Sequence, residues 1–217
     1  MSGEFHIFET MRWIPGSEDV PGGFPLGYAH FRRIHASARA LQFPFRPKDI
    51  HLALENAVAE KIVPQRVRLA IFESSRIDVA VQDHDDLPEG TVWKVAVAET
   101  RLDSADQWLR HKTSNRAVYD NDRAAYCTGP DARCDELIYV NEHGDVCEGA
   151  ITNVFAADAE GILRTPSLDS GLLPGVLRGQ LLADGSAVEA RLTLEDLQNA
   201  PALYVGNALR GLIPARL

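Results

Sequence analysis

The sequence predicts an α+β protein built as two lobes. Most of the strand-like runs are short, and they do not alternate regularly with helical segments as they would in a doubly wound sheet. A polar stretch with no clear period lies near the middle of the chain and is typical of a connector. We therefore expect an N-terminal lobe over residues 1–102 and a C-terminal lobe over residues 109–217, joined by residues 103–108. The absence of a GxGxxG motif also disfavours a Rossmann fold.

The first predicted element is a strand over Phe5–Trp13, followed by a loop rich in proline and glycine. Over Leu26–Leu41, apolar and small residues recur at helical spacing and predict a helix. Pro44 and Pro47 are expected to end this helix, because proline lacks the backbone N–H that a helix interior needs. Asp49 can then cap a second helix.

Three strands are predicted to complete the first half, because their residues alternate in polarity or are β-branched. They cover Val67–Phe72, Ile77–Val81 and Val92–Ala98.

The second half begins with a short predicted helix over Asn115–Ala125. A turn at His143-Gly144 predicts a hairpin between the two strands that flank it. A further helix is expected to begin at Pro174-Gly175. The predicted strands of this half are Glu136–Asn141, Asp145–Glu148, Asn153–Ala157, Ile162–Thr165 and Ala202–Val205.

Composition excludes several classes of function. Lysine and arginine total 22 against 31 acidic residues, a net charge of -9, which argues against nucleic acid as a partner. No apolar run approaches the roughly 20 residues that span a bilayer, so no membrane association is expected. The N-terminus lacks the basic start and apolar middle of a signal peptide, which predicts a cytoplasmic protein.

The three cysteines, Cys127, Cys134 and Cys147, match no CxxC metal or redox spacing. A Cys127–Cys134 bridge is possible, but reduced thiols are the expectation for a cytosolic protein. The histidines stand in no metal-ligand spacing such as HExxH, and no GxSxG elbow is present. A metallohydrolase and the commonest serine hydrolases are therefore disfavoured, and no metal is expected.

Several segments carry polar residues that plain structure does not require. His30, Arg33 and Ser37 share one face of the first predicted helix and suggest an anion contact. Lys112 lies between Arg110 and Arg116 near the expected start of a helix. Positive neighbours disfavour the charged form of a lysine and favour the nucleophilic amine that forms Schiff bases. A basic, solvent-exposed helix start would explain the same residues.

Two further features complete a recognisable set. Pro174-Gly175 would present free backbone N–H groups, which bind phosphate without a basic side chain. Glu148, which follows a strand, is either a surface residue or the carboxylate that keeps a cofactor's pyridine nitrogen protonated. A lysine, an acid and a phosphate cradle together are the components of a pyridoxal-phosphate site.

Six sequence blocks occur in the order found in one enzyme family. They are FETMR, HFRRIHASA, HKTSNR, CEGAITNVF, TPSLDSGLLPGVLR and GNALRGLIPA. Together they resemble the blocks of the class IV (fold-type IV) pyridoxal-phosphate enzymes, over nearly the whole chain. That family includes branched-chain aminotransferases, D-amino-acid aminotransferases and aminodeoxychorismate lyases. The resemblance implies a small α/β lobe followed by a larger lobe with a barrel-like sheet.

The resemblance also implies the site. Lys112 matches the Schiff-base lysine, Arg33 the phosphate-binding arginine and Glu148 the partner of the pyridine nitrogen. The other residues that match cofactor-binding positions are Asn153, Val176, Leu177, Asn207 and Ala208. Because the substrates of both activities are carboxylates, a guanidinium should face the site. The candidates are Arg12, Arg210 and Arg110.

Within the family, HKTSNRAVYD and GNALRGL look most like aminodeoxychorismate lyases. The resemblance therefore implies release of pyruvate and 4-aminobenzoate, a step of folate biosynthesis, with a branched-chain or D-amino-acid aminotransferase as the alternative. Two departures stand out. The chain starts almost on FETMR, without the family's usual preceding strand, and Leu177 replaces a phosphate-binding threonine. A homodimer that binds a small-molecule amine is implied, and a non-catalytic member that binds a partner is the contrasting alternative.

Overall fold

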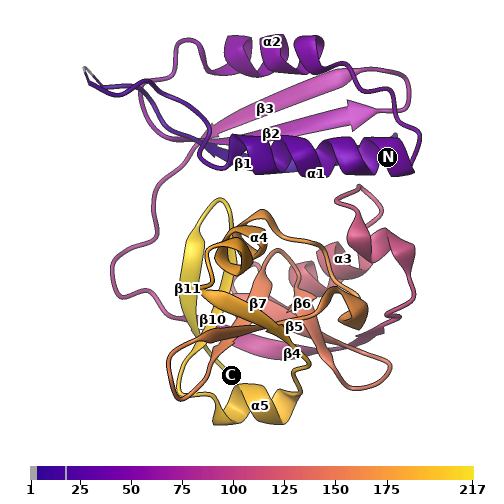
Figure 1. The fold of residues 1–217 in the computed structure, drawn as a ribbon, viewed down its shortest axis with the longest axis vertical. Helices are drawn as coiled ribbons and strands as arrows, with labels where there is room; N and C mark the ends of the chain where they lie inside the picture. Colours follow the sequence, from indigo (N-terminus) through magenta and orange to yellow (C-terminus); the bar gives the residue numbers. More distant parts are fainter. Residues whose placement is uncertain (1–3, 18) are drawn as a thin grey trace. The chain divides into compact units, whose positions relative to one another are not determined.

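The computed structural model describes residues 4–17 and 19–217, and the chain falls into two compact units (Figure 1). The first unit comprises Met1–Asp86 with His111–Asn115, and the second comprises Leu87–Arg110 with Arg116–Leu217. The first three residues of the expected N-terminal lobe, and Glu18 in its loop, lie outside the described residues.

These units differ from the predicted boundary in three segments, and the first is the expected connector over residues 103–108, which lies inside the second unit. The strand β4 (Trp93–Leu102) was expected in the N-terminal lobe but belongs to the second unit, because it pairs in parallel with β5 (Glu136–Asn141) and β11 (Gly211–Arg216). The segment His111–Asn115 was expected in the C-terminal lobe but belongs to the first unit, where Thr113 bridges to Ile7.

The first unit is built on a three-stranded antiparallel sheet. Its strands lie in the order β1 (His6–Trp13), β2 (Gln65–Phe72) and β3 (Ile77–Asp83). Alternate side chains of β1 and β2, such as Ile7 and Leu69, point to one face and are buried there. This period of two is the pattern that predicted the strand at Val67–Phe72.

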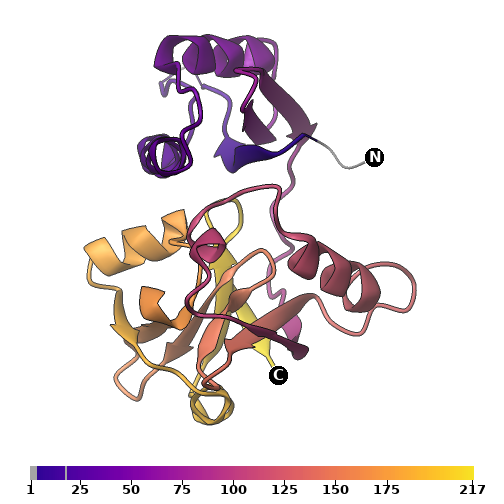
Figure 2. The ribbon, with the colours of Figure 1, turned by 90° about the vertical axis from the view of Figure 1, so that its right-hand side faces the viewer.

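Two helices cover that face, and Figure 2 shows both on the same side of the sheet. They are α1 (Gly27–Ala40) and α2 (Pro47–Val58), and they contribute Ile34, Ile50 and Leu54 to the core. The role expected for Pro47 is wrong. It occupies the first turn of α2, where a missing N–H costs nothing, and Asp49 lies inside that turn rather than capping it.

The second unit contains one eight-stranded curled sheet (Figures 1 and 2). Its strand order is β6-β5-β4-β11-β10-β7-β8-β9. The strands not yet given are β6 (Val146–Gly149), β7 (Asn153–Ala157), β8 (Leu163–Pro166), β9 (Ala187–Ala190) and β10 (Leu203–Asn207). This barrel-like sheet confirms the predicted α+β fold class.

Short helices connect these strands. They are η1 (Gln107–Arg110), α3 (Ala117–Tyr126), η2 (Leu168–Ser170), α4 (Val176–Ala183) and α5 (Leu194–Asn199). The helix α3 lies in the connection between the parallel neighbours β4 and β5, a crossover that the sequence did not reveal. The elements β9 and α5 were also not predicted, and the capping box of Thr193 and Asp196 at the start of α5 was a local signal for that helix.

The expectation that all cysteines are reduced is wrong. A disulfide joins Cys127 and Cys134, whose Cα atoms lie 4.9 Å apart, while Cys147 is a free buried thiol. Cys127 directly follows α3, and the returning chain brings Cys134 beside it, a proximity that depends on the tertiary path. Among the described residues, no helix is both long enough and apolar enough to cross a membrane.

Candidate functional site

Lys112 lies on an extended segment of the first unit, not at the mouth of a helix. Its carbonyl oxygen accepts a hydrogen bond from the backbone N–H of Phe8 at 2.9 Å, which aligns the segment with β1. Its Nζ lies 4.8 Å from the centre of the Phe8 ring, within range of a cation–π contact. The lysine is half-buried. Its position is therefore fixed by strand pairing rather than by a helix.

Arg33 lies against a buried carboxylate that the sequence analysis did not assign. Arg33 donates from Nε to Glu9 Oε1 at 2.7 Å and from Nη2 to Glu9 Oε2 at 2.6 Å. The Nδ1 atom of His30 also lies 2.7 Å from Glu9 Oε2. The third member of the predicted polar face, Ser37, lies 3.0 Å from Nδ1 of His111. The polar face of α1 thus contacts both β1 and the segment that carries Lys112.

Glu9 is 1% exposed. Burial alone would raise its pKa, but the Arg33 guanidinium and hydrogen bonds from His30 and Arg33 lower the pKa from 4.5 to about 2. A bidentate carboxylate of this kind fixes the plane of a guanidinium. Glu9 therefore orients Arg33, the expected phosphate contact.

The depressed pKa of Glu9 predicts a pH dependence of stability. The stabilising ionised form is fully present above pH 4.5 and is lost as the pH falls toward 2. We expect Glu9→Gln to lower the free energy of unfolding at pH 7 by roughly 3–5 kcal/mol, as for other broken buried pairs. The variant should also lose less of its remaining stability than the parent does as the pH falls from 4.5 to about 2. Chemical unfolding at each pH measures both effects.

The matched control is Asp86→Asn, since Asp86 pairs with Arg12 in the same unit but is 69% exposed. Exposed pairs contribute little to stability, so this variant should follow the parent's pH profile closely. An unchanged acid decline in Glu9→Gln would contradict the role given to Glu9.

Arg12, a candidate for the substrate carboxylate, already has a carboxylate partner. Its Nη1 and Nη2 atoms donate to the two oxygens of Asp86 at 2.6 and 3.0 Å. The hydrogen bond from Arg12 lowers the pKa of Asp86. Arg12 would have to leave Asp86 or share it before binding a substrate carboxylate.

In the second unit, Glu148 lies at the end of β6, is 7% exposed and is held at both oxygens. Tyr119 on α3 donates its hydroxyl to Oε1 at 2.7 Å, and the backbone N–H of Leu173 donates to Oε2 at 3.0 Å. Burial and the nearby Glu148 carboxylate raise the pKa of Tyr119, so the phenol keeps its proton and remains a donor. Tyr119 was not among the expected site residues, because it follows the HKTSNR block without any local sequence signal of this contact.

The start of α4 is built closely around Asn153. Asn153 donates from Nδ2 to the carbonyl oxygen of Leu173 at 3.1 Å, and a Cβ placed on Gly175 would lie only 1.7 Å from Asn153 Oδ1. None of the described side chains caps this helix. The first-turn N–H groups of Val176 and Leu177 have no partner within the helix, so this end has the donors and the positive dipole that an anion needs.

The late-strand residues approach the same region. Asn207, the last residue of β10, donates from Nδ2 to the Ile151 carbonyl at 3.1 Å and accepts from the N–H groups of Leu209 and Arg210 at 3.1 and 3.0 Å. Ala208 is half-buried in the turn that these bonds define. A Cβ on Gly206 would lie 2.9 Å from a methyl carbon of Leu177, so β10 passes close to the start of α4.

The two remaining arginine candidates also lie in the second unit. The guanidinium carbon of Arg210 lies 5.9 Å from the centre of the Trp93 ring, and Arg110 ends η1 in a half-buried position.

The structure therefore gathers the expected site residues in two sets. Arg33 and Lys112 lie in the first unit, with Arg12. The second unit holds Glu148 and the segments around it, and these segments are joined to one another by hydrogen bonds or close contacts. Those segments carry Asn153, Val176, Leu177, Asn207 and Ala208.

Comparisons with known proteins show what this chain as a whole is similar to. The crystal structure of a provisionally assigned amino-acid aminotransferase from Mesorhizobium loti is 44% identical, with a TM-score of 0.91, over 99% of this chain and 100% of that one. A provisionally assigned aminodeoxychorismate lyase from Schizosaccharomyces pombe is 26% identical over 95% of this chain and 87% of its own length.

A third relative, described as a probable branched-chain-amino-acid aminotransferase from Thermotoga maritima, is 35% identical over 88 residues, which is 38% of this chain and 32% of that protein. The family profile described as amino-transferase class IV matches residues 6–217. This chain belongs to the class IV aminotransferase family.

Proposed function

We propose that this protein is a pyridoxal-phosphate-dependent lyase that splits 4-amino-4-deoxychorismate into pyruvate and 4-aminobenzoate. The observation that carries the proposal is the pairing of a fixed carboxylate with an uncapped helix start. Glu148 is held by Tyr119 and by the N–H of Leu173, and Leu173 directly precedes the Pro174-Gly175 start of α4. The similarity to the Schizosaccharomyces pombe protein supports the lyase activity.

The residues fit the cofactor that class IV enzymes use. The start of α4 offers N–H donors for a phosphate, and the glycine at 175 leaves the space that Asn153 fills. Glu148 has the charge needed to pair with a pyridinium nitrogen. In this proposal Lys112 would hold the cofactor covalently, and Arg33, Val176, Leu177, Asn207 and Ala208 are the residues that would bind its phosphate.

Pyridoxal phosphate, when bound, supplies an electron sink for a carbanion next to the substrate amine. The chain's own residues would then control protons and orientation. The amine of Lys112 would take the proton from the carbon that bears the substrate amine. Glu148 would keep the pyridine nitrogen protonated, and Tyr119 would keep Glu148 in place. Arg12, Arg110 or Arg210 would bind the substrate carboxylate.

The second candidate function is an aminotransferase that acts on branched-chain or D-amino acids. The specific observation in its favour is the similarity to the Mesorhizobium loti protein over the full length of both chains. The two activities share the proton abstraction by Lys112. In the lyase reaction the substrate would lose its side chain as pyruvate. In the aminotransferase reaction a proton would instead be returned, and a 2-oxo acid would be released.

The deciding experiment assays both reactions with the same protein preparation loaded with pyridoxal phosphate. Pyruvate release from aminodeoxychorismate, with no amino transfer from amino acids to 2-oxo acids, is the expected result. Amino transfer without pyruvate release would replace the lyase proposal by the aminotransferase one. Cofactor binding with no turnover in either assay would favour a non-catalytic binding protein.

Tyr119→Phe tests the orientation of Glu148. Loss of the hydroxyl leaves Glu148 Oε1 without this donor, which typically costs about 1–3 kcal/mol for a buried group. We expect turnover to fall about tenfold, because the carboxylate is no longer fixed. The control is Tyr139→Phe, since Tyr139 packs against Tyr119 and donates to Asp122 at 3.2 Å rather than to Glu148. Equal effects of the two variants on turnover would reject the role of Tyr119.

A further inference from the structure

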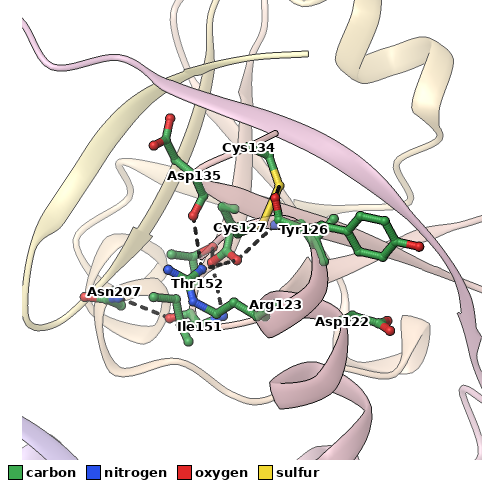
Figure 3. Close-up of polar contacts among 12 residues, drawn as sticks. Asp122, Arg123, Tyr126, Cys127, Cys134, Asp135, Ile151, Thr152 and Asn207 are labelled. Atoms are coloured by element: carbon green, nitrogen blue, oxygen red, sulfur yellow. Dashed lines mark hydrogen bonds and ion pairs between the residues drawn. A yellow bond between two sulfur atoms is a disulfide. The ribbon is translucent and has the colours of Figure 1, made fainter. Parts of the chain in front are cut away.

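Besides Glu9 and Glu148, a third buried carboxylate lies beside the turn that joins β6 to β7. Glu136, the first residue of β5, is 0% exposed. Its Oε1 accepts from Arg123 Nη1 at 3.1 Å and from the N–H of Leu137 at 3.0 Å. Its Oε2 accepts from Thr152 Oγ1 at 2.9 Å and from the N–H of Ile151 at 3.1 Å. Figure 3 shows Arg123, Ile151 and Thr152 gathered around these contacts.

Stability alone gives little reason for a carboxylate at this position. Burial raises the pKa of Glu136, while Arg123 and the hydrogen bonds from Ile151 and Thr152 oppose the rise. Buried ion pairs can often be replaced by apolar residues of similar volume without loss of stability. A carboxylate can, however, accept several hydrogen bonds at once and so fix several donors relative to one another.

Two of the donors to Glu136, the N–H of Ile151 and the hydroxyl of Thr152, belong to a short irregular turn, residues 150–152. Glu148 lies two residues before this turn, and Asn153 follows it directly. The carbonyl oxygen of Ile151, inside the turn, accepts the hydrogen bond from Asn207 Nδ2 (Figure 3). Three of the residues assigned to the cofactor above therefore meet at one segment.

Gly149 shows that the packing around this turn is specific. A Cβ at this position would lie 2.2 Å from Thr152 Oγ1 and 3.0 Å from Glu136 Oε2. The glycine is therefore required by the space that the Thr152–Glu136 hydrogen bond occupies. The 150–152 turn and the Glu136 carboxylate are therefore packed tightly against each other.

We propose that Glu136 is a positioning residue for the cofactor site. It holds the 150–152 turn, and the turn fixes Glu148, Asn153 and Asn207. Arg123 also donates to the Asp135 carbonyl at 3.1 Å and so ties α3 to the start of β5 next to the Cys127–Cys134 disulfide. The inference rests on the proposed function and adds a residue that would not itself touch cofactor or substrate.

The sharpest test removes one donor from the turn and leaves the carboxylate in place. Thr152→Val deletes the hydroxyl that reaches Glu136, and Thr152→Ser restores a hydroxyl. The matched control is Thr165→Val, since Thr165 is also buried and donates one hydrogen bond, to the Val154 carbonyl at 2.9 Å, away from Glu136. Melting temperatures measured without cofactor show how far each variant is destabilised.

The main readout is the dissociation constant of pyridoxal phosphate, titrated into cofactor-free protein and followed by visible absorbance. We expect Thr152→Val to bind about tenfold more weakly, Thr152→Ser to bind nearly as the parent does, and Thr165→Val to bind unchanged despite a similar fall in melting temperature. Glu136→Gln should weaken pyridoxal-phosphate binding further. The NH2 group of the new amide donates hydrogen bonds and cannot accept them from the donors that now face one oxygen of Glu136.

Two results would overturn the inference. Unchanged affinity in Thr152→Val, or equal weakening in Thr152→Val and Thr165→Val, would show that the turn affects only general stability while the proposed function stands. Failure of the parent protein itself to bind pyridoxal phosphate would remove the proposed function, and this inference with it.

Discussion

Replacing Lys112 by alanine is expected to abolish turnover and covalent cofactor attachment together. No other group on the Lys112 segment carries an amine, and the segment is held in place by the Phe8 N–H and the Thr113–Ile7 bridge, which the substitution leaves intact. The fold should therefore survive. Loss of a positioned acid–base group alone costs about 10²- to 10⁴-fold in rate, and loss of the covalent anchor adds to this.

The measurement combines a spectrum with chemical trapping. The parent protein with pyridoxal phosphate should be yellow, and after borohydride reduction the labelled peptide should contain Lys112. Lys61→Ala is the control, because Lys61 is an exposed lysine in the turn after α2. Near-parental activity in Lys112→Ala, or a label on another lysine, would refute the assignment.

The site residues were proposed from sequence blocks, and those blocks did not reveal the local settings of the residues. The HKTSNR block pointed to Lys112, yet the helix-mouth setting expected for Lys112 is wrong, because residues 112–114 pair with β1, more than 100 positions away. The register of such long-range pairing is set by which faces become buried, and no local pattern reports it.

The partners of the site residues depended on the same long-range contacts. Glu9, Tyr119 and Glu136 each hold a residue or turn of the proposed site, and each forms its contact across at least 13 positions of chain. The Cys127–Cys134 disulfide was left open for a related reason, since spacing alone does not show whether two Cα atoms approach within bonding reach.

Strand prediction succeeded where periodicity was strong. The alternation over Val67–Phe72 predicted β2 correctly, and the turn at residues 143–144 predicted the hairpin of β5 and β6. The short strand β9 gave no comparable signal, because four residues with two exposed side chains are too few to define a period.

The substitution Glu148→Gln removes the charge of Glu148 and keeps the shape of the side chain. We expect the variant protein to bind the cofactor but to turn over at least tenfold more slowly than the parent. The neutral amide can still accept the hydrogen bond from Tyr119, so the side chain keeps one of its two contacts. It cannot supply the negative charge that keeps a pyridine nitrogen protonated, so proton abstraction by Lys112 would lose its main electrostatic support.

Glu142→Gln makes the same chemical change at an exposed carboxylate, whose oxygens accept from the N–H and hydroxyl of Ser104 and whose pKa those hydrogen bonds lower to about 2. Single-turnover rates of both variants, measured with saturating pyridoxal phosphate, isolate the charge effect from cofactor affinity. A rate for Glu148→Gln within a factor of about three of the parent corresponds to less than ~1 kcal/mol of barrier. Such a small effect would mean that Glu148 shapes the second unit without controlling the cofactor's protonation.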